Sequence, residues 1–182
     1  VGVKKSSVFV DDVFSTHLHT GDSSNQTINN GVDNTKGGLV WFKSRSQGSV
    51  SHALVDTERG AGKKIYSDLT AAEGTYDQSS YALSAFTSTG FSLKDDDASN
   101  CFNQSGITYS TWNFRKAPGF FTICEWTGNG SGPRSISHDL GSVPGLIMIK
   151  CRSLANRDWR VWHRSFDKAG DNMRLNATSA VS

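Results

Sequence analysis

The chain has 182 residues and a formal net charge of +2, because 19 lysines and arginines are set against 17 acidic residues. Charges of both signs are interspersed, so the sequence offers no basic stripe for nucleic acid and no polybasic segment for a membrane surface, and we expect neither partner. Serine, threonine and glycine are abundant, while ten phenylalanines and five tryptophans can supply a core. This mixture favours strands and turns over helices.

Cysteine usage and hydropathy narrow the class of protein further. No apolar run approaches the roughly 20 residues that a membrane-spanning helix needs. Cys101, Cys124 and Cys151 are odd in number and lack the spacing of a metal site. We therefore interpret them as unpaired thiols of a protein from a reducing compartment, and we expect no cofactor.

The hydrophobic pattern predicts six strands. In four of them apolar and polar residues alternate with a period of two, which is typical of a strand with one buried face. The other two are nearly continuous apolar runs, which indicate central strands covered on both faces. In chain order the six lie at residues 13–20, 39–43, 109–114, 121–127, 146–150 and 159–164, the second and fifth being the continuous runs.

Helix and linker signals are weak. The only helix candidate lies at residues 69–86, but Gly74 interrupts it, so we expect no more than a short turn there. Residues 116–119 contain a proline and a glycine, which predict a short, stiff join that ends one strand before Phe120 starts the next.

One segment of the chain recurs about 107 residues further on. Residues 38–46, GLVWFKSRS, return as residues 145–153, GLIMIKCRS, with glycine, leucine, lysine, arginine and serine in register. Upstream of this match, residues 20–21 correspond to residues 127–128, both Thr-Gly. The pattern predicts a tandem repeat.

The repeat predicts the organisation of the chain. We expect a lead-in segment at residues 1–13, a first β-sandwich repeat at residues 14–119 and a second repeat at residues 120–182. The second copy ends near the counterpart of residue 75, and a segment of that length is marginal for a stable core. We therefore predict an all-β antiparallel sandwich with an incomplete second copy, whose missing strands come from sequence beyond residue 182 or from a partner.

Eight segments carry a resemblance to a known family. They are VDDVFST at residues 10–16, GLVWFK at 38–43, DTERGA at 56–61, STGFSL at 88–93, WNFRKAPGFF at 112–121, TGNG at 127–130, ISHDLGSVPG at 136–145 and WRVWH at 159–163. Together they resemble a concanavalin-like (lectin- and glucanase-like) repeat domain of uncharacterised function. This domain occurs in tail-fibre and other appendage proteins of marine phages, notably cyanophages. The resemblance extends over nearly the whole chain.

The resemblance implies a jelly-roll fold and a non-enzymatic structural protein of the phage virion. The expected role is a tail fibre or tail appendage involved in attachment to the host, assembled in the bacterial cytoplasm. Expected partners are other tail or capsid proteins and further copies of the chain, with a trimer suggested by analogy with fibres in general. The alternatives are a lectin-like module that recognises host surface polysaccharide, and a capsid-attached decoration or head fibre.

A catalytic site is not expected. A glycan hydrolase would need two carboxylates facing each other across the scissile bond. Asp56 and Glu58 would share one face of an extended segment, but Arg59 adjoins them, and the second copy has His163 and Ser165 at the same positions. We therefore predict a salt-bridged loop at this place and no enzyme.

Two other clusters resemble metal sites only in part. His17 and His19 would point to the same side of a strand, but no third ligand is close in the sequence. Residues 95–100, DDDASN, offer oxygen ligands at alternate positions but lack the glycine and the glutamate of a calcium loop. We expect no metal at either place.

The tryptophans provide the remaining candidate site. Trp126, Trp159 and Trp162 could stack against sugar rings. Alternation along the last strand puts Trp159 toward the core and places Arg160, Trp162 and Arg164 on the opposite face. These three are the candidate contacts with a carbohydrate or a protein partner.

Overall fold

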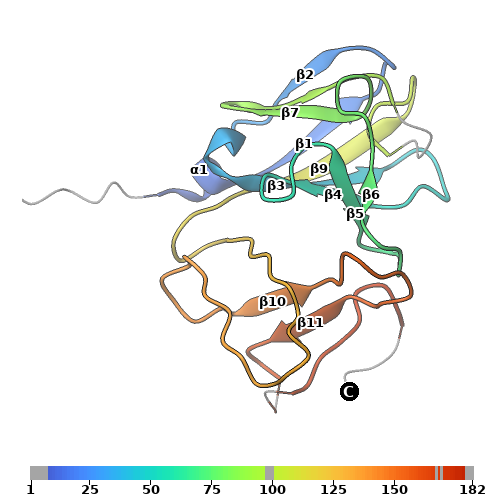
Figure 1. The fold of residues 1–182 in the computed structure, drawn as a ribbon. Coiled ribbons are helices and arrows are strands. Elements are labelled where there is room, and N and C mark those ends of the chain that lie inside the picture. Colours follow the sequence, from blue (N-terminus) through green and yellow to red (C-terminus); the bar gives the residue numbers. More distant parts are fainter. Residues whose placement is uncertain (1–7, 97–100, 167, 169, 179–182) are drawn as a thin grey trace, which may run out of the picture.

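The computed structural model describes residues 8–96, 101–166, 168 and 170–178, and the expected all-β antiparallel architecture is confirmed (Figure 1). Two sheets face each other in the upper part of Figure 1, and a third, small sheet lies below them. We call residues 14–119 the first unit and residues 120–178 the second unit.

The first unit is a sandwich of a six-stranded and a three-stranded sheet. All the strand pairs within these sheets are antiparallel. The larger sheet has the order β1 (Phe14–Thr20), β9 (Thr108–Arg115), β3 (Gly38–Ser44), β4 (Ala53–Asp56), β5 (Lys63–Tyr66) and β6 (Gly74–Thr75). The smaller has the order β2 (Gln26–Asn29), β8 (Gly90–Leu93) and β7 (Leu83–Thr87).

Four short elements complete the described fold. The helix α1 (Val10–Val13) precedes β1, and the 3-10 helix η1 (Asn34–Lys36) precedes β3. The second unit contains the antiparallel pair β10 (Leu146–Ile149) and β11 (Arg160–His163). The sequence did not predict α1, which carries two aspartates in its first turn.

The core of the first unit lies between its two sheets and follows from the alternation along β3. Val40 and Phe42 are fully buried on the inner side of this strand. The ring of Phe42 lies 5.3 Å from that of Phe91 on β8 and 4.9 Å from that of Phe102. Edge-to-face contacts of this kind stabilise an aromatic core beyond the burial of its surface.

The opposite side of β3 is covered by the second unit. Leu39 and Trp41 pack into a second apolar cluster with Leu54, Met148 and Trp159. The prediction that residues 39–43 form a central strand covered on both faces is therefore confirmed.

The same prediction for residues 146–150 is wrong. In β10, Leu146, Ile147 and Ile149 are 53%, 37% and 39% exposed. The strand pairs with β11 alone among the described strands, and only one side of this hairpin packs against the first unit.

The predicted strand at residues 121–127 is also wrong. The described structure there contains only an isolated bridge between Ala117 and Phe121. Alternation alone does not make a strand, because the backbone also needs a neighbour to hydrogen-bond with. The join at residues 116–119 is a turn, with Gly119 at φ 76°, but the strand expected from Phe120 does not follow it.

The other predicted elements are confirmed, with small changes of boundary. Residues 13–20 and 159–164 contain β1 and β11, and residues 109–114 lie within β9. No helix forms at residues 69–86, which contain β6 and the start of β7.

Truncation of Phe42 tests the core. We expect Phe42→Ala to lower the free energy of unfolding by about 3–5 kcal/mol, because it leaves a cavity among buried aromatic rings. The matched control is Leu18→Ala on β1, a side chain that is 60% exposed and should change stability by no more than about 0.5 kcal/mol. Chemical denaturation measures both, and equal losses would contradict the assignment of the core.

Candidate functional site

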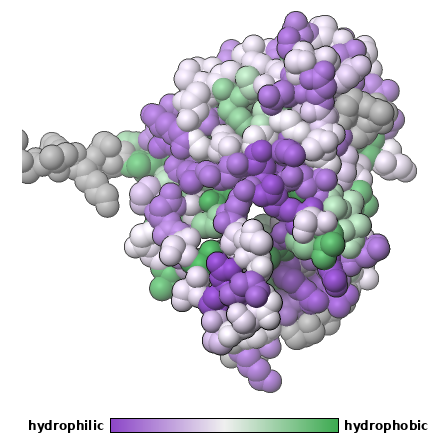
Figure 2. Space-filling view, viewed as in Figure 1, coloured by the Kyte–Doolittle hydropathy of each residue, from purple (hydrophilic) through white to green (hydrophobic). Residues whose placement is uncertain are grey.

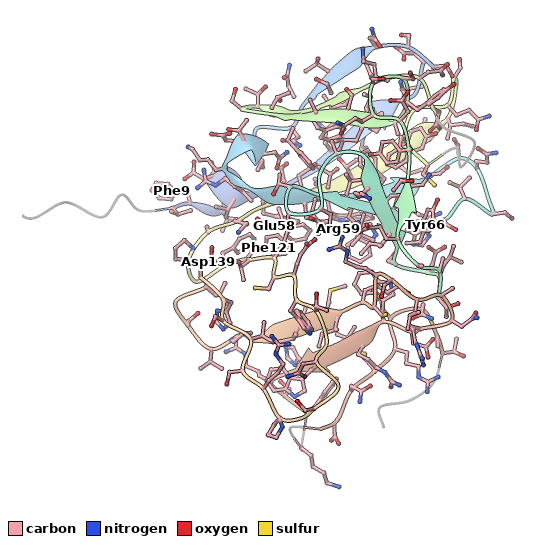
Figure 3. All side chains as sticks on the ribbon, viewed as in Figure 1. Phe9, Glu58, Arg59, Tyr66, Phe121 and Asp139 are labelled. Carbon is pink, nitrogen blue, oxygen red and sulfur yellow. The ribbon has the colours of Figure 1, made fainter. Side chains whose placement is uncertain are left out.

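Charged and aromatic side chains gather at the boundary between the two units. Figure 3 shows Arg59, Tyr66 and Phe121 near this boundary, with Arg59 on the side of the first unit and Phe121 on the chain that enters the second. The boundary consists of an ion network, an apolar contact and a cavity, which are described in turn.

The ion network begins at the end of β4. Asp56 accepts hydrogen bonds from the backbone N–H groups of Glu58 and Arg59, at 3.1 and 2.9 Å. Its Oδ2 lies 2.6 Å from Nε of Arg59, and the two side chains are only 5% and 3% exposed. Glu58 instead pairs with Lys116 at 2.9 Å. The predicted salt-bridged loop is confirmed, and Asp56 and Glu58 point to different partners.

The network then crosses the boundary through Glu73. Arg152 of the second unit donates from Nε and Nη2 to the two carboxylate oxygens of Glu73, at 2.8 and 3.2 Å. The backbone N–H of Glu73 also donates to the carbonyl of Arg152, at 2.8 Å. Arg59 approaches the same carboxylate at 3.7 Å, and Arg152 forms a further ion pair with Glu125. Glu73 therefore joins arginines of both units.

Electrostatics favour the ionised form of Glu73. Burial of the carboxyl acts to raise its pKa, but the hydrogen bond and charge of Arg152, together with the charges of Arg59 and Lys63, hold the pKa below its ordinary value. The same contacts raise the pKa of Arg152 above its usual range, since the hydrogen bond from its guanidinium to Glu73 outweighs the cost of burial.

The apolar contact beside this network depends on Trp159. Its side chain is 4% exposed, and its indole Nε1 donates to the carbonyl of Tyr66 at 2.7 Å. The ring packs against Leu54 and Ile65 of the first unit. The prediction that Trp159 is a core residue is confirmed, although the core it enters is the one between the units.

A cavity of about 190 Å³ lies next to Trp159. It is lined by the chain from Phe121 to Trp126 and by Met148, Ile149, Lys150 and Arg152. Leu39, Leu54 and Ile65 of the first unit line it as well. In Figure 2 the surface is hollowed between the upper and lower parts of the molecule, with hydrophobic residues beside the hollow.

Two of the predicted contact residues, Arg160 and Trp162, lie on β11, and Arg164 follows it directly; their contact role stays a prediction. Arg160 and Arg164 are exposed, and Trp162 is half-buried. The indole nitrogen of Trp162 is buried and has no hydrogen-bond partner among the described residues. Arg160 donates to Asn172 at 2.8 Å. Within β11, alternation places Arg160 and Trp162 on the face opposite the buried Val161, whereas Arg164 lies in the turn after the strand.

The two partial metal motifs have other roles or fall partly outside the described residues. His19 is buried, its ring stacks on that of Tyr109 at 5.0 Å, and its Nε2 lies 3.0 Å from the carbonyl oxygen of Phe102. Asp95 and Asp96 are described, whereas residues 97–100 are not. Within the described residues, no group of three or more histidine, cysteine, aspartate or glutamate side chains could hold a metal ion. No disulfide joins Cys101, Cys124 and Cys151 to one another, and Cys101 is buried.

Sequence reasoning missed the ion network and the cavity. Glu73 and Arg152 are 79 positions apart in the chain, and neither belongs to a recognisable motif. One signal was available, because Arg152 has the same place in the segment GLIMIKCRS that Arg45 has in the similar segment GLVWFKSRS. The pairing with Glu73 nevertheless depends on how the second unit sits on the first.

Comparison with known proteins gives one match. The model of a family described as a domain of unknown function (DUF7483) matches residues 10–182. Neither the curated proteins nor the solved structures give a match. Among the described residues, no helix has the length and apolar character needed to cross a membrane.

Replacement of Glu73 tests the ion network. We expect Glu73→Gln to lower the free energy of unfolding by roughly 1.5 kcal/mol at pH 7, because hydrogen bonds between charged groups are lost at a partly buried place. The folded-state pKa of Glu73 is depressed, so its contribution is present above the unfolded pKa and is lost as the pH falls through the folded pKa.

The difference between Glu73→Gln and the unsubstituted chain should therefore shrink between pH 5 and pH 2, which denaturation curves at several pH values measure. Lys36→Gln is the control, since it removes an exposed ion pair with Asp33 that contributes little. A difference that stays constant with pH would contradict the role given to the charge of Glu73.

Proposed function

The chain belongs to this family of domains of unknown function, and we propose that it is a non-enzymatic structural protein of a phage virion, a tail fibre or tail appendage that takes part in attachment to the host. The observation that supports the proposal most is a correspondence between two hairpins, one in each unit. It favours the finer fold assignment too, a tandem of concanavalin-like jelly-roll repeats in which the second copy is incomplete.

The two hairpins have the same register at the offset of the sequence repeat. In the first, β3 pairs with β4 as Leu39 with Asp56, Val40 with Val55 and Trp41 with Leu54. In the second, β10 pairs with β11 as Leu146 with His163, Ile147 with Trp162 and Met148 with Val161. Each residue of the second set stands about 107 positions after its counterpart.

The hydrogen bonds next to the two hairpins correspond as well. Thr57 N–H donates to the carbonyl of Gly38, and Arg164 N–H donates to that of Gly145, both at 3.0 Å. In the turn after the hairpin, Glu58 N–H donates to Oδ1 of Asp56, and Ser165 N–H donates to Nδ1 of His163. Different side chains thus fill the same place in the two turns.

Serial stacking of the units supports a structural role. The second unit packs on the outer face of the larger sheet through Trp159 and Met148 and is joined to it by Glu73 and Arg152. Modules that bury surface against their neighbours in sequence build long and rigid projections. Association of several chains, with a trimer as the expected form, and contacts with other tail or capsid proteins belong to the same proposal.

The contacts of Asp56 and Glu58 agree with a non-enzymatic role. Asp56 is buried, and both of its oxygens have partners in Arg59 and the neighbouring backbone. Glu58 is paired with Lys116 in the turn that follows. Glycoside hydrolysis needs two carboxyl groups that face a common substrate, and these two face separate cations.

A glycan-binding role is the second candidate. It is favoured by Arg160 and Trp162, which share one face of β11, and by the exposed Arg164 in the turn that follows the strand. An aromatic ring beside hydrogen-bond donors is suited to a sugar, although the buried indole nitrogen of Trp162 would take no part in binding. The two roles are compatible, since a fibre can also bind host polysaccharide.

Peptide mass mapping of purified phage particles tests the structural proposal. We expect peptides of this chain in intact particles and, after mild disassembly, in the tail fraction. Their presence in the head fraction would favour a capsid decoration or head fibre instead. Their restriction to the soluble lysate would contradict a virion role.

Substitution at β11 tests the glycan proposal. We expect Trp162→Ala to reduce binding to host surface polysaccharide at least about tenfold, which corresponds to the stacking of one ring against a sugar. Tyr81→Ala is the matched control, because Tyr81 is an exposed aromatic residue (43%) of the first unit and is not a candidate for sugar contact. Equal binding by the two variants and the unsubstituted chain would rule out β11 as the contact.

A further inference from the structure

Two asparagine–glycine dipeptides occur in the chain, at residues 30–31 and 129–130, and both lie in the same kind of turn. In each turn the side-chain oxygen Oδ1 of the asparagine accepts a hydrogen bond from the backbone N–H two residues further on. The donor is Val32 in the first turn, at 2.9 Å, and Ser131 in the second, at 3.2 Å. Each glycine has a positive φ, 83° and 71° respectively. The two dipeptides therefore share their local geometry and can be compared directly.

An asparagine–glycine dipeptide can lose ammonia when the glycine nitrogen attacks the asparagine side chain. The nitrogen gives its proton to hydroxide, and its electron pair forms a bond to Cγ of the asparagine. The bond between Cγ and Nδ2 breaks, and ammonia leaves with a proton from water. Water then opens the cyclic imide at one of its two carbonyl carbons, which leaves aspartate or isoaspartate. Glycine favours the attack because it has no Cβ to hinder its own nitrogen.

The hydrogen bond to Oδ1 favours this attack in both turns. Negative charge develops on Oδ1 as the nitrogen adds to Cγ, and an N–H group already directed at this oxygen stabilises the charge. A difference in rate between the two dipeptides must then come from the attacking nitrogen and the leaving ammonia.

The fold restrains both of these groups at residues 30–31. Gly31 N–H donates to the carbonyl of Thr89 at 3.2 Å, and Asn30 N–H donates to the same oxygen at 2.9 Å. The Asn30 side chain is 9% exposed, and its Nδ2 is buried. Removal of the Gly31 proton would break a hydrogen bond, and ammonia would have to leave a buried place. Reaction here requires local opening of the structure.

Neither restraint is present at residues 129–130. Asn129 and Gly130 are both exposed, so water reaches the attacking nitrogen and the departing ammonia. Among the residues that the structure describes, none accepts a hydrogen bond from Gly130 N–H. A methyl group on Gly130 would meet no atom within 4 Å apart from those of its neighbours in sequence. The loop therefore has room for the cyclic imide without prior opening.

We propose that Asn129 is a deamidation site of the folded protein and that the fold protects Asn30 from the same reaction. The proposal rests on the contacts of the two turns and does not depend on a role in the virion.

Conversion at Asn129 would change both the charge and the backbone of residues 127–134. Arg134 carries the single charge of this segment, and its Nη1 donates to the carbonyl of Thr127 at 2.7 Å. A carboxylate at position 129 makes the segment neutral and offers the guanidinium an anionic acceptor, to which hydrogen bonds are stronger than to a carbonyl. Isoaspartate also adds a carbon atom to the main chain within the turn.

The rates at the two dipeptides test the proposal. The intact chain is incubated at mildly alkaline pH, digestion at acidic pH stops the reaction, and tandem mass spectrometry locates each converted residue. We expect Asn129 to convert at least about tenfold faster than Asn30, which corresponds to an opening free energy of about 1.4 kcal/mol at Asn30. Equal rates in the folded chain would overturn the proposal.

The denatured chain provides the control for the fold. In guanidinium chloride the contacts with Thr89 are absent, so the rates at Asn30 and Asn129 should agree to within about twofold. A tenfold difference that persists in the denatured chain would assign the effect to the neighbouring residues and would overturn the protection by the fold. Conversion of Asn129 in the denatured chain alone would overturn its assignment as a site of the folded protein.

Two glycine substitutions test the attacking nitrogen. Gly130→Ala places a methyl group beside this nitrogen and should slow conversion of Asn129 by roughly tenfold. Gly128→Ala is the matched control, because it adds the same group in equally open space on the other side of Asn129 and should leave the rate unchanged. Equal slowing by the two variants would contradict attack by the Gly130 nitrogen.

Discussion

The structure depends on one constraint, which is that β3 has apolar side chains on both faces and both faces must be covered. Val40 and Phe42 meet the smaller sheet of the first unit, and Leu39 and Trp41 meet Trp159 and Met148 of the second. A sheet with a single covered face would have left Trp41 in water, and large apolar patches rarely stay uncovered on a soluble protein. The second unit is therefore part of how the first unit is stabilised.

This constraint explains why the ion network lies where it does. Apolar surfaces pack without a strong preference for orientation, whereas the forked contact between Arg152 and Glu73 requires a particular geometry. Buried ion pairs often add little net stability compared with apolar side chains of similar size. Glu73 then serves mainly to select one orientation of the second unit on the first. The backbone hydrogen bond from Glu73 N–H to the carbonyl of Arg152 favours the same orientation.

The sequence predicted the architecture where local pattern and tertiary pairing agree. Alternation at residues 109–114 and the apolar run at 39–43 became β9 and β3, because each strand found neighbours on both sides. At residues 121–127 the same alternation gave no strand, since a local pattern cannot report whether a neighbour is present. The contact of Glu73 with Arg152 could not be predicted either. It joins residues of two units, and no local sequence pattern encodes how the two units are placed relative to each other.

The correspondence of the two hairpins also changes how the face of β11 is understood. Trp162 stands at the position of Val55, and Ile147 stands at that of Val40, both of which are fully buried in the first unit. In the proposed tandem of repeats these two positions correspond to core positions of the first unit, so the partial exposure of Trp162 and Ile147 alone is no sign of a sugar site. Arg160 is different, because it replaces the buried Ala53 with a charged side chain that cannot be covered by an apolar layer without a partner. A surface that covers β11 must therefore supply an acceptor for this guanidinium, which both a polysaccharide and an acidic protein segment can do.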